Sequence, residues 1–194
     1  MPPKVRISKS DIVDTAVELV RKNGEQAINA RSIASELNCS TQPIFSNFAS
    51  MEDLRSAVKS AANARYQACL DADMASGRYP PYKASGMAYI RFAKEERELF
   101  RLLFMCDRSN ETVEDDRASV RPLLEIIQSN LNINEDEAYL FHLEMWIYAH
   151  GIATMIATSF LNWDDALISK LLSDAYEGLK HRYMEGKNHA GNQN

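Results

Sequence analysis

The stretch that decides the fold is ARSIASELNCSTQPIFSNFASMEDL, residues 30–54. Apolar side chains recur in it at helical spacing, but a polar run over residues 38–42 interrupts them. One helical pattern ends near Leu37 and the next begins near Thr41. After Gly, Asn is the residue that best tolerates a left-handed backbone, so Asn38 predicts a sharp turn between two short helices.

The second of these helices is expected over residues 41–48, with Ser40 as its N-cap. Pro43 falls in the first turn, where a missing N–H costs little. Because Pro43 has no N–H to offer, we expect the Ser40 hydroxyl to accept a hydrogen bond from the N–H of Gln42 instead.

Helical patterns also fill the rest of the chain, and we predict an all-α fold. Only 7 Gly and 6 Pro punctuate 194 residues, which favours long helices over strands. Ser8, Asn29, Ser50 and Asn134 are expected N-caps, and Gly24 is expected to end the first helix. The expected helices span 9–22, 30–37, 41–48, 51–75, 82–94, 96–105, 113–131 (bent or interrupted at Pro122), 135–161 and 164–184.

Composition places the chain among soluble globular proteins, with 45% apolar and 25% charged residues. No apolar run is long enough to cross a bilayer, and the first residues have no signal-peptide pattern, so we expect a cytoplasmic protein with no membrane partner. Cys39, Cys69 and Cys106 have no metal-ligand spacing and are expected to be free thiols.

The net charge of −5 is distributed unevenly. Residues 1–66 hold 9 Lys and Arg against 7 Asp and Glu, a net charge of +2, and residues 67–194 carry −7. The N-terminal part is therefore the one suited to a polyanion. Lys4, Arg6 and Lys9 form a small basic arm there, which is either a phosphate contact or a solvated tail.

Three short helices with a tight turn between the second and third are typical of a helix-turn-helix. In that motif the third helix presents polar side chains to the major groove. Thr41, Gln42, Ser46 and Asn47 are the expected exposed positions, and their hydroxyl and amide groups suit base edges and phosphates. Periodicity alone favours equally a plain helical hairpin with its polar side facing water.

A family resemblance favours the first alternative. Residues 8–58 resemble the N-terminal DNA-binding domain of the TetR family of bacterial transcriptional repressors. The resemblance implies an N-terminal helix-turn-helix domain and a C-terminal helical domain for ligand binding and dimerisation. We accordingly expect domains over 1–50 and 51–186, followed by a flexible tail over 187–194. The matching features are Ile33-Ala34, Ser40-Thr41, Phe45-x-x-Phe48 and Ser50-x-Glu52-Asp53-Leu54.

The sequence departs from the family pattern at four positions. Asn38 stands where Gly is usual, Phe45 where Tyr is usual, Asn47 where His is usual, and Met51 where Lys is common. Loss of a phenol and of a cation subtracts phosphate contacts and weakens the salt dependence. The residues expected at double-stranded operator DNA are Lys4, Arg6, Lys9, Arg31, Ser40, Thr41, Gln42, Phe45, Ser46 and Asn47.

The C-terminal part is rich in aromatic and sulfur-containing side chains, which line both apolar ligand pockets and ordinary cores. Trp146-x-x-x-His150-Gly151 resembles a motif in one branch of the family. His150 lies one turn after Trp146 and bonds either a ligand or a buried carbonyl, the structural role being the commoner. The residues expected around an unidentified small-molecule effector are Tyr89, Phe92, Phe104, Met105, Phe141, Met145, Trp146 and His150.

The resemblance also implies a homodimer in which the last two helices of each subunit form a four-helix bundle. The expected interface residues are Ile152, Met155, Ile156, Ser159, Leu167, Leu171, Leu172, Ala175 and Leu179.

The expected function is that of a dimeric DNA-binding regulator, a repressor that a small molecule releases from its operator. The alternative is a helical small-molecule carrier that no longer binds DNA strongly, which Phe45, Met51 and the acidic total favour. An enzyme is the third class, but the sequence has no phosphate loop, zinc-protease motif or nucleophile elbow. We expect no catalytic residues, no metal and no cofactor.

Overall fold

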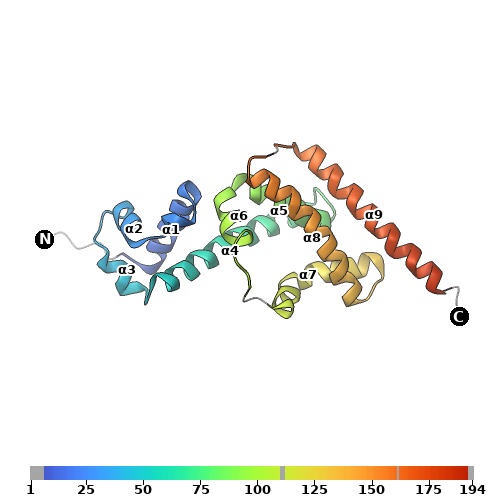
Figure 1. The fold of residues 1–194 in the computed structure, drawn as a ribbon, viewed down its shortest axis with the longest axis horizontal. Helices are drawn as coiled ribbons and strands as arrows, with labels where there is room; N and C mark the ends of the chain where they lie inside the picture. Colours follow the sequence, from blue (N-terminus) through green and yellow to red (C-terminus); the bar gives the residue numbers. More distant parts are fainter. Residues whose placement is uncertain (1–6, 110–111, 161, 192–194) are drawn as a thin grey trace. The chain divides into compact units, whose positions relative to one another are not determined.

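The structure, a computed structural model, describes residues 7–109, 112–160 and 162–191, with side chains described up to residue 185. All regular elements in these ranges are helices, and no strand occurs among them, which confirms the all-α prediction (Figure 1). The elements are α1 (Lys9–Asn23), the 3₁₀ turn η1 (Glu25–Ala27), α2 (Ala30–Glu36), α3 (Gln42–Asn47), α4 (Met51–Ala75), α5 (Pro81–Glu95), α6 (Arg97–Phe104), α7 (Val113–Leu131), α8 (Glu135–Ala157) and α9 (Asp165–Gly191).

The helices form two compact units. The N-terminal unit comprises Met1–Ala68 and Glu95–Cys106, so it contains α1 to α3, most of α4 and all of α6. The C-terminal unit comprises Cys69–Lys94 and Asp107–Asn194, which hold the end of α4, α5 except its last residue, and α7, α8 and α9. These units are defined by contacts, and the domain limits expected from the sequence stay a prediction.

Local capping explains how the N-terminal unit begins. The Ser8 hydroxyl accepts from the Asp11 N–H at 3.1 Å, and the Asp11 carboxylate accepts from the Ser8 N–H at 2.8 Å. The Ser8 hydrogen bonds lower the pKa of Asp11, because they stabilise its ionised form. Gly24 ends α1 at φ +82°, where a Cβ would lie 2.8 Å from the Gln26 side chain. Both predicted signals, the cap and the Gly, are confirmed.

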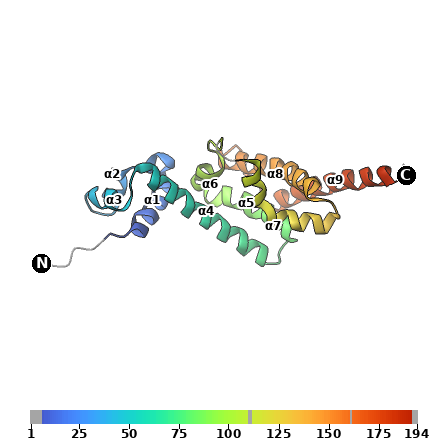
Figure 2. The ribbon, with the colours of Figure 1, turned by 90° about the horizontal axis from the view of Figure 1, so that it is seen from below.

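The core of the N-terminal unit gathers the apolar faces of α1 to α4 and α6, and Figure 2 shows α1, α2 and α3 grouped together. Helix α6 contributes because it packs on α1. The buried side chains include Ile12, Ala16, Val20, Ile33, Ile44, Phe48, Leu54, Val58, Leu99, Phe100 and Leu102.

The turn between α2 and α3 has the predicted conformation at Asn38, with φ at +51°. The expected Ser40 cap is wrong. Helix α3 begins at Gln42, its N-cap is Thr41, and no side chain caps it. Thr41 has helical angles, φ −71° and ψ −12°, whereas a capping side chain needs an extended backbone. The Thr41 carbonyl instead accepts from the N–H groups of Ile44 and Phe45.

The C-terminal unit differs from expectation mainly at helix ends. Helix α7 runs unbroken through Pro122. Helix α8 ends at Ala157, because Ser159 adopts a left-handed conformation at φ +59°. Helix α9 continues to Gly191, so residues 187–191 of the expected tail are helical, while 192–194 lie outside the described residues.

Candidate nucleic-acid and effector sites

Helix α3 divides cleanly into an inward and an outward face. Ile44 is 1% exposed and Phe48 2%, so these two side chains anchor the helix in the N-terminal unit. Gln42, Phe45 and Ser46 lie on the opposite face and are exposed, Phe45 to 56%. Phe45 and Ser46 lie three and four residues after Gln42, so each of their side chains neighbours that of Gln42 on the helix surface.

Two polar side chains of α3 already use part of their hydrogen-bonding capacity. The Ser46 hydroxyl donates to the Gln42 carbonyl at 2.9 Å, and the Asn47 amide donates to the Pro43 carbonyl at 2.8 Å. Asn47 and Thr41 are half-buried rather than exposed as expected. Gln42 is therefore the exposed polar residue of α3 at which the side chain is best placed to reach another molecule.

The four predicted DNA-binding cations all come from the N-terminal part of the sequence: Lys4, Arg6, Lys9 and Arg31. Lys4 and Arg6 lie outside the described residues. Lys9 is exposed, and its ammonium lies 4.7 Å from the centre of the Phe48 ring, where α3 ends. Arg31 is exposed at the start of α2, and Ser40 is exposed before α3. The described cations Lys9 and Arg31 thus belong to the same unit as the exposed face of α3.

The interior of the C-terminal unit contains two pairs of Tyr and His between α5 and α8. The Tyr82 hydroxyl lies 3.1 Å from Nδ1 of His142, and the Tyr89 hydroxyl lies 2.8 Å from Nδ1 of His150. Trp146 stacks on His150, with ring centres 4.8 Å apart and planes at 18°. Polar groups are thus fixed within an otherwise apolar interior.

Burial keeps both imidazoles neutral at neutral pH. It lowers the pKa of His142 to about 4, although Asp116 opposes the shift. Burial, and then the positive charge of Arg108, lower the pKa of His150. Burial also raises the pKa of the Tyr82 phenol, which therefore keeps its proton. Neutral imidazoles and intact phenols suit hydrogen bonding to an uncharged polar group better than ion pairing.

The residues expected around an effector are placed in both units. Tyr89, Phe92, Phe141 and Met145 are buried in the C-terminal unit, and Trp146 and His150 are half-buried there. Phe104 belongs to the N-terminal unit, where its ring lies 5.1 Å from that of Tyr66 and 5.2 Å from that of Phe100. Met105 is in the same unit and is 41% exposed.

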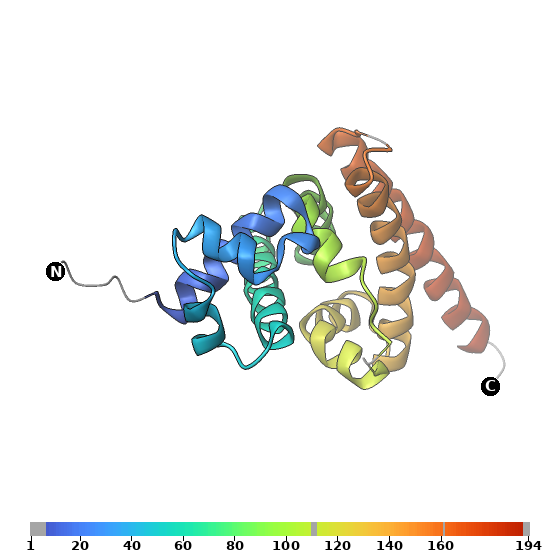
Figure 3. The ribbon, with the colours of Figure 1, turned by 60° about the vertical axis from the view of Figure 1, so that its left-hand side comes forward.

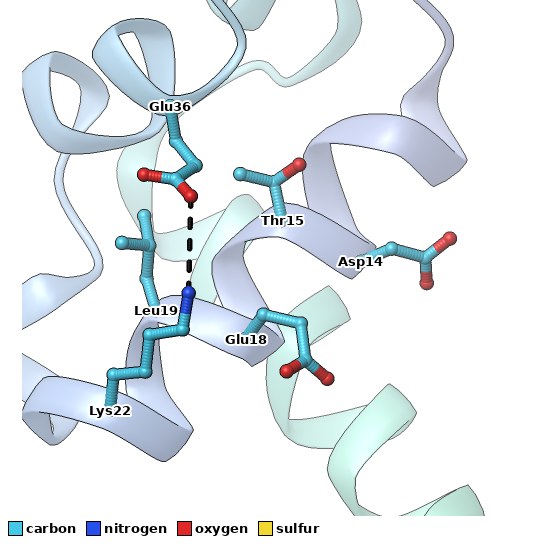
Figure 4. A pocket seen from close by; sticks show the side chains of 6 residues that line it. All are labelled: Asp14, Thr15, Glu18, Leu19, Lys22 and Glu36. Atoms are coloured by element: carbon cyan, nitrogen blue, oxygen red, sulfur yellow. Dashed lines mark ion pairs between the residues drawn. The ribbon is translucent and has the colours of Figure 1, made fainter.

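Hollows that open on the described surface include two that are lined by none of these eight residues. One of about 50 Å³ lies in the C-terminal unit, beside Met87, Ile90 and Ile168. The other, of about 320 Å³, lies in the N-terminal unit and is shown in Figure 4. It is lined by Asp14, Thr15, Glu18, Leu19, Lys22 and Glu36.

An exposed apolar stripe on α8 was not identified from the sequence. Leu140, Ile147, Tyr148 and Met155 are 52%, 65%, 40% and 39% exposed, and their spacing places them on one side of the helix. Gly151 lies in the same stripe, and a Cβ there would meet no atom of the chain within 4 Å. Only Met155 of this stripe was among the expected interface residues, because periodicity identifies apolar positions but not which of two apolar sides faces out.

The other expected interface residues differ in burial. Ile152, Ile156 and Leu172 are 3–5% exposed, so they are already buried within the chain itself. Ser159 and Leu167 are exposed. Leu171, Ala175 and Leu179 are half-buried on α9, which lies side by side with α8 in Figures 1 and 3.

The described part of the chain carries neither a membrane span nor a metal cluster. In those residues no helix is long and apolar enough to span a membrane. The same residues contain no group of three or more His, Cys, Asp or Glu side chains placed to hold a metal ion.

Comparisons with known proteins agree with this architecture. Residues 82–174 match the family described as the tetracyclin repressor-like, C-terminal domain. The chain is similar to the structure of a TetR-like transcriptional regulator from Rhodococcus sp. RHA1, with 17% identity and a TM-score of 0.62 over 96% of this chain and 99% of that one. It is also similar to the multidrug binding protein EbrR in complex with imidazole, with 14% identity and a TM-score of 0.55 over 86% and 88%. No curated protein matches the sequence.

These similarities assign the fold: it is that of TetR-like transcriptional regulators. Within that class, residues 82–174 form a C-terminal domain of the tetracycline-repressor type. The resemblance to the TetR family is therefore confirmed in the fold of the chain and in the family match over residues 82–174.

Proposed function

We propose that the protein is a dimeric, DNA-binding transcriptional regulator, a repressor that a small molecule releases from its operator. The observation that carries the proposal is the division of α3. Buried Ile44 and Phe48 hold the helix, and Gln42, Phe45 and Ser46 face outward from it. A recognition helix needs this arrangement, because the side chains that reach base edges must be exposed while the helix itself is held rigidly.

A dimer is supported by the stripe on α8 defined by Leu140, Ile147, Tyr148 and Met155. Four large apolar side chains exposed in a row are unusual on a monomer and typical of an interface. Gly151 in the stripe and Gly178 on α9 have open space where a Cβ would lie, which leaves room for the helices of a second subunit to approach closely. A two-fold axis would then present two α3 helices to major grooves about 34 Å apart.

The proposed effector is a small aromatic or apolar molecule that carries an uncharged hydrogen-bonding group. Support comes from the Tyr89–His150 pair and the stacked Trp146, which combine a flat apolar surface with a polar atom. The similar protein EbrR is a multidrug binding protein. Release from DNA requires that the effector bind the DNA-free arrangement of the dimer more tightly than the DNA-bound one.

Fluorescence anisotropy with DNA flanking the gene tests the proposal. We expect specific binding that weakens as salt rises, because phosphate contacts release counterions. Gln42→Ala should weaken specific binding by about tenfold, the cost of one good base contact. Gln67→Ala is the matched control, since Gln67 is also an exposed glutamine of the N-terminal unit. Absence of specific binding at low salt would instead favour the small-molecule carrier.

A further inference from the structure

Phe45 is a large apolar side chain left exposed on the proposed DNA-binding face. Phe48, three residues later, is 2% exposed, whereas Phe45 is 56% exposed. Among the described residues of the N-terminal unit, Phe45 and Met105 are the exposed large apolar side chains, and only Phe45 lies on α3. The exposed part of the Phe45 ring can make apolar contacts only with another molecule that binds to this face.

The major groove offers such a ring one apolar group on its base edges, the C5-methyl group of thymine. A phenyl group has no donor for a phosphate oxygen and no donor or acceptor for the other base edges. We infer that Phe45 contacts thymine methyl groups and so makes α3 selective for A·T base pairs. This inference rests on the proposed DNA binding and adds to it the bases that are read.

The neighbours of Phe45 have hydrogen-bonding groups that suit the same base pairs. Gln42 is exposed, and a glutamine amide pairs in bidentate fashion with adenine N6 and N7. The Ser46 hydroxyl donates its hydrogen to the Gln42 carbonyl, so toward the groove it offers an acceptor. An acceptor suits the N6 amino group of adenine and equally the N4 amino group of cytosine, but not guanine O6 and N7, so the preference for A·T pairs rests on Phe45 and Gln42 rather than on Ser46.

Substitution of deoxyuridine for thymidine tests the inference, because the change removes only the C5-methyl group. The operator is first selected from random duplex DNA with the wild-type protein. Each thymine is then replaced singly, and the dissociation constant is measured by anisotropy. At one position in each half-site we expect affinity to fall about fourfold, the effect of burying one methyl group.

Three variants assign that loss to its residue. In Phe45→Ala, replacing the critical thymidine by deoxyuridine should no longer lower the affinity. In Phe45→Leu, which keeps an apolar side chain, the same replacement should still lower the affinity in part. Gln42→Ala, which removes a neighbouring contact, should keep the full loss. Circular dichroism checks that each variant is folded.

The outcomes separate the inference from the proposed function. If the wild type selects an operator but no thymine shows a loss that depends on Phe45, the inference is wrong and DNA binding stands. The same holds if Phe45→Ala weakens binding equally to every sequence, since the ring then lies against the sugar–phosphate backbone. If the wild type selects no sequence at all, both are wrong.

Discussion

His142 couples the stability of the C-terminal unit to pH. The side chain is 8% exposed, its Nδ1 lies 3.1 Å from the Tyr82 hydroxyl, and burial lowers its pKa to about 4. An unfolded histidine has a pKa near 6.5. Between these values the unfolded chain binds a proton that the folded chain does not. The contribution of His142 to the free energy of unfolding is therefore fully present above pH 6.5 and is lost as the pH falls toward 4.

Urea unfolding at pH 7.5 and pH 5.0 measures this effect. We expect the free energy of unfolding to fall by about 2 kcal/mol from this histidine. His142→Gln should remove that part of the pH dependence. His181→Gln is the control, because the His181 side chain is 73% exposed. An equal pH dependence in the His142 variant and the wild type would show that another group carries it.

The structural role of a residue could be predicted from the sequence where neighbouring residues determine it. It could not be predicted where tertiary packing determines which side chain is buried. The caps at Ser8 and Asn134 and the turns at Gly24 and Asn38 depend on backbone angles over three or four residues, and all four are confirmed. The family resemblance placed Phe45 at the DNA, but periodicity alone could not predict its exposure, because Phe45 and Phe48 are the same residue type and the packing of α1 beside α3 decides which one is buried.

Helix α6 is joined to α1 by an ion pair between residues 75 apart in sequence. The Arg21 guanidinium donates to both Glu96 oxygens, at 2.6 and 2.8 Å, and this pairing raises the pKa of Arg21. Arg65 of α4 lies 3.2 Å from the same carboxylate, which is 15% exposed. Three helices of the N-terminal unit thus meet at Glu96.

Glu96→Gln should lower the free energy of unfolding by about 2 kcal/mol, since two guanidinium groups lose a largely buried, charged acceptor. Glu177→Gln is the control, because Glu177 is 65% exposed and surface pairs contribute little. Chemical denaturation of both variants checks the difference. If both variants were as stable as the wild type, the contact would not stabilise α6 against α1. The sequence could not predict this junction, because no local pattern links Arg21 to Glu96.

For the whole molecule, the proposed function depends on pairing two α3 helices, and the α8 stripe is the surface proposed to pair them. Helix positions along the chain could be predicted from periodicity. The outward side of α8 could not, because its mixed pattern places Ile152 and Ile156 inward and Ile147 and Met155 outward. Which apolar side is covered within the subunit depends on how α5, α7 and α9 pack around α8.

Ile147→Arg tests this surface because Ile147 is 65% exposed, so the subunit should keep its fold while the interface gains two charges related by the two-fold axis. We expect sedimentation to show a monomer and operator affinity to fall by on the order of a hundredfold or more, since a monomer loses the avidity of two linked contacts. Val113→Arg places the same charge at a 58% exposed position on α7 and should leave both measurements unchanged. If the Ile147 variant stays dimeric and binds its operator normally, the dimer interface does not lie on α8. If it is a monomer that still binds normally, DNA binding does not require two recognition helices.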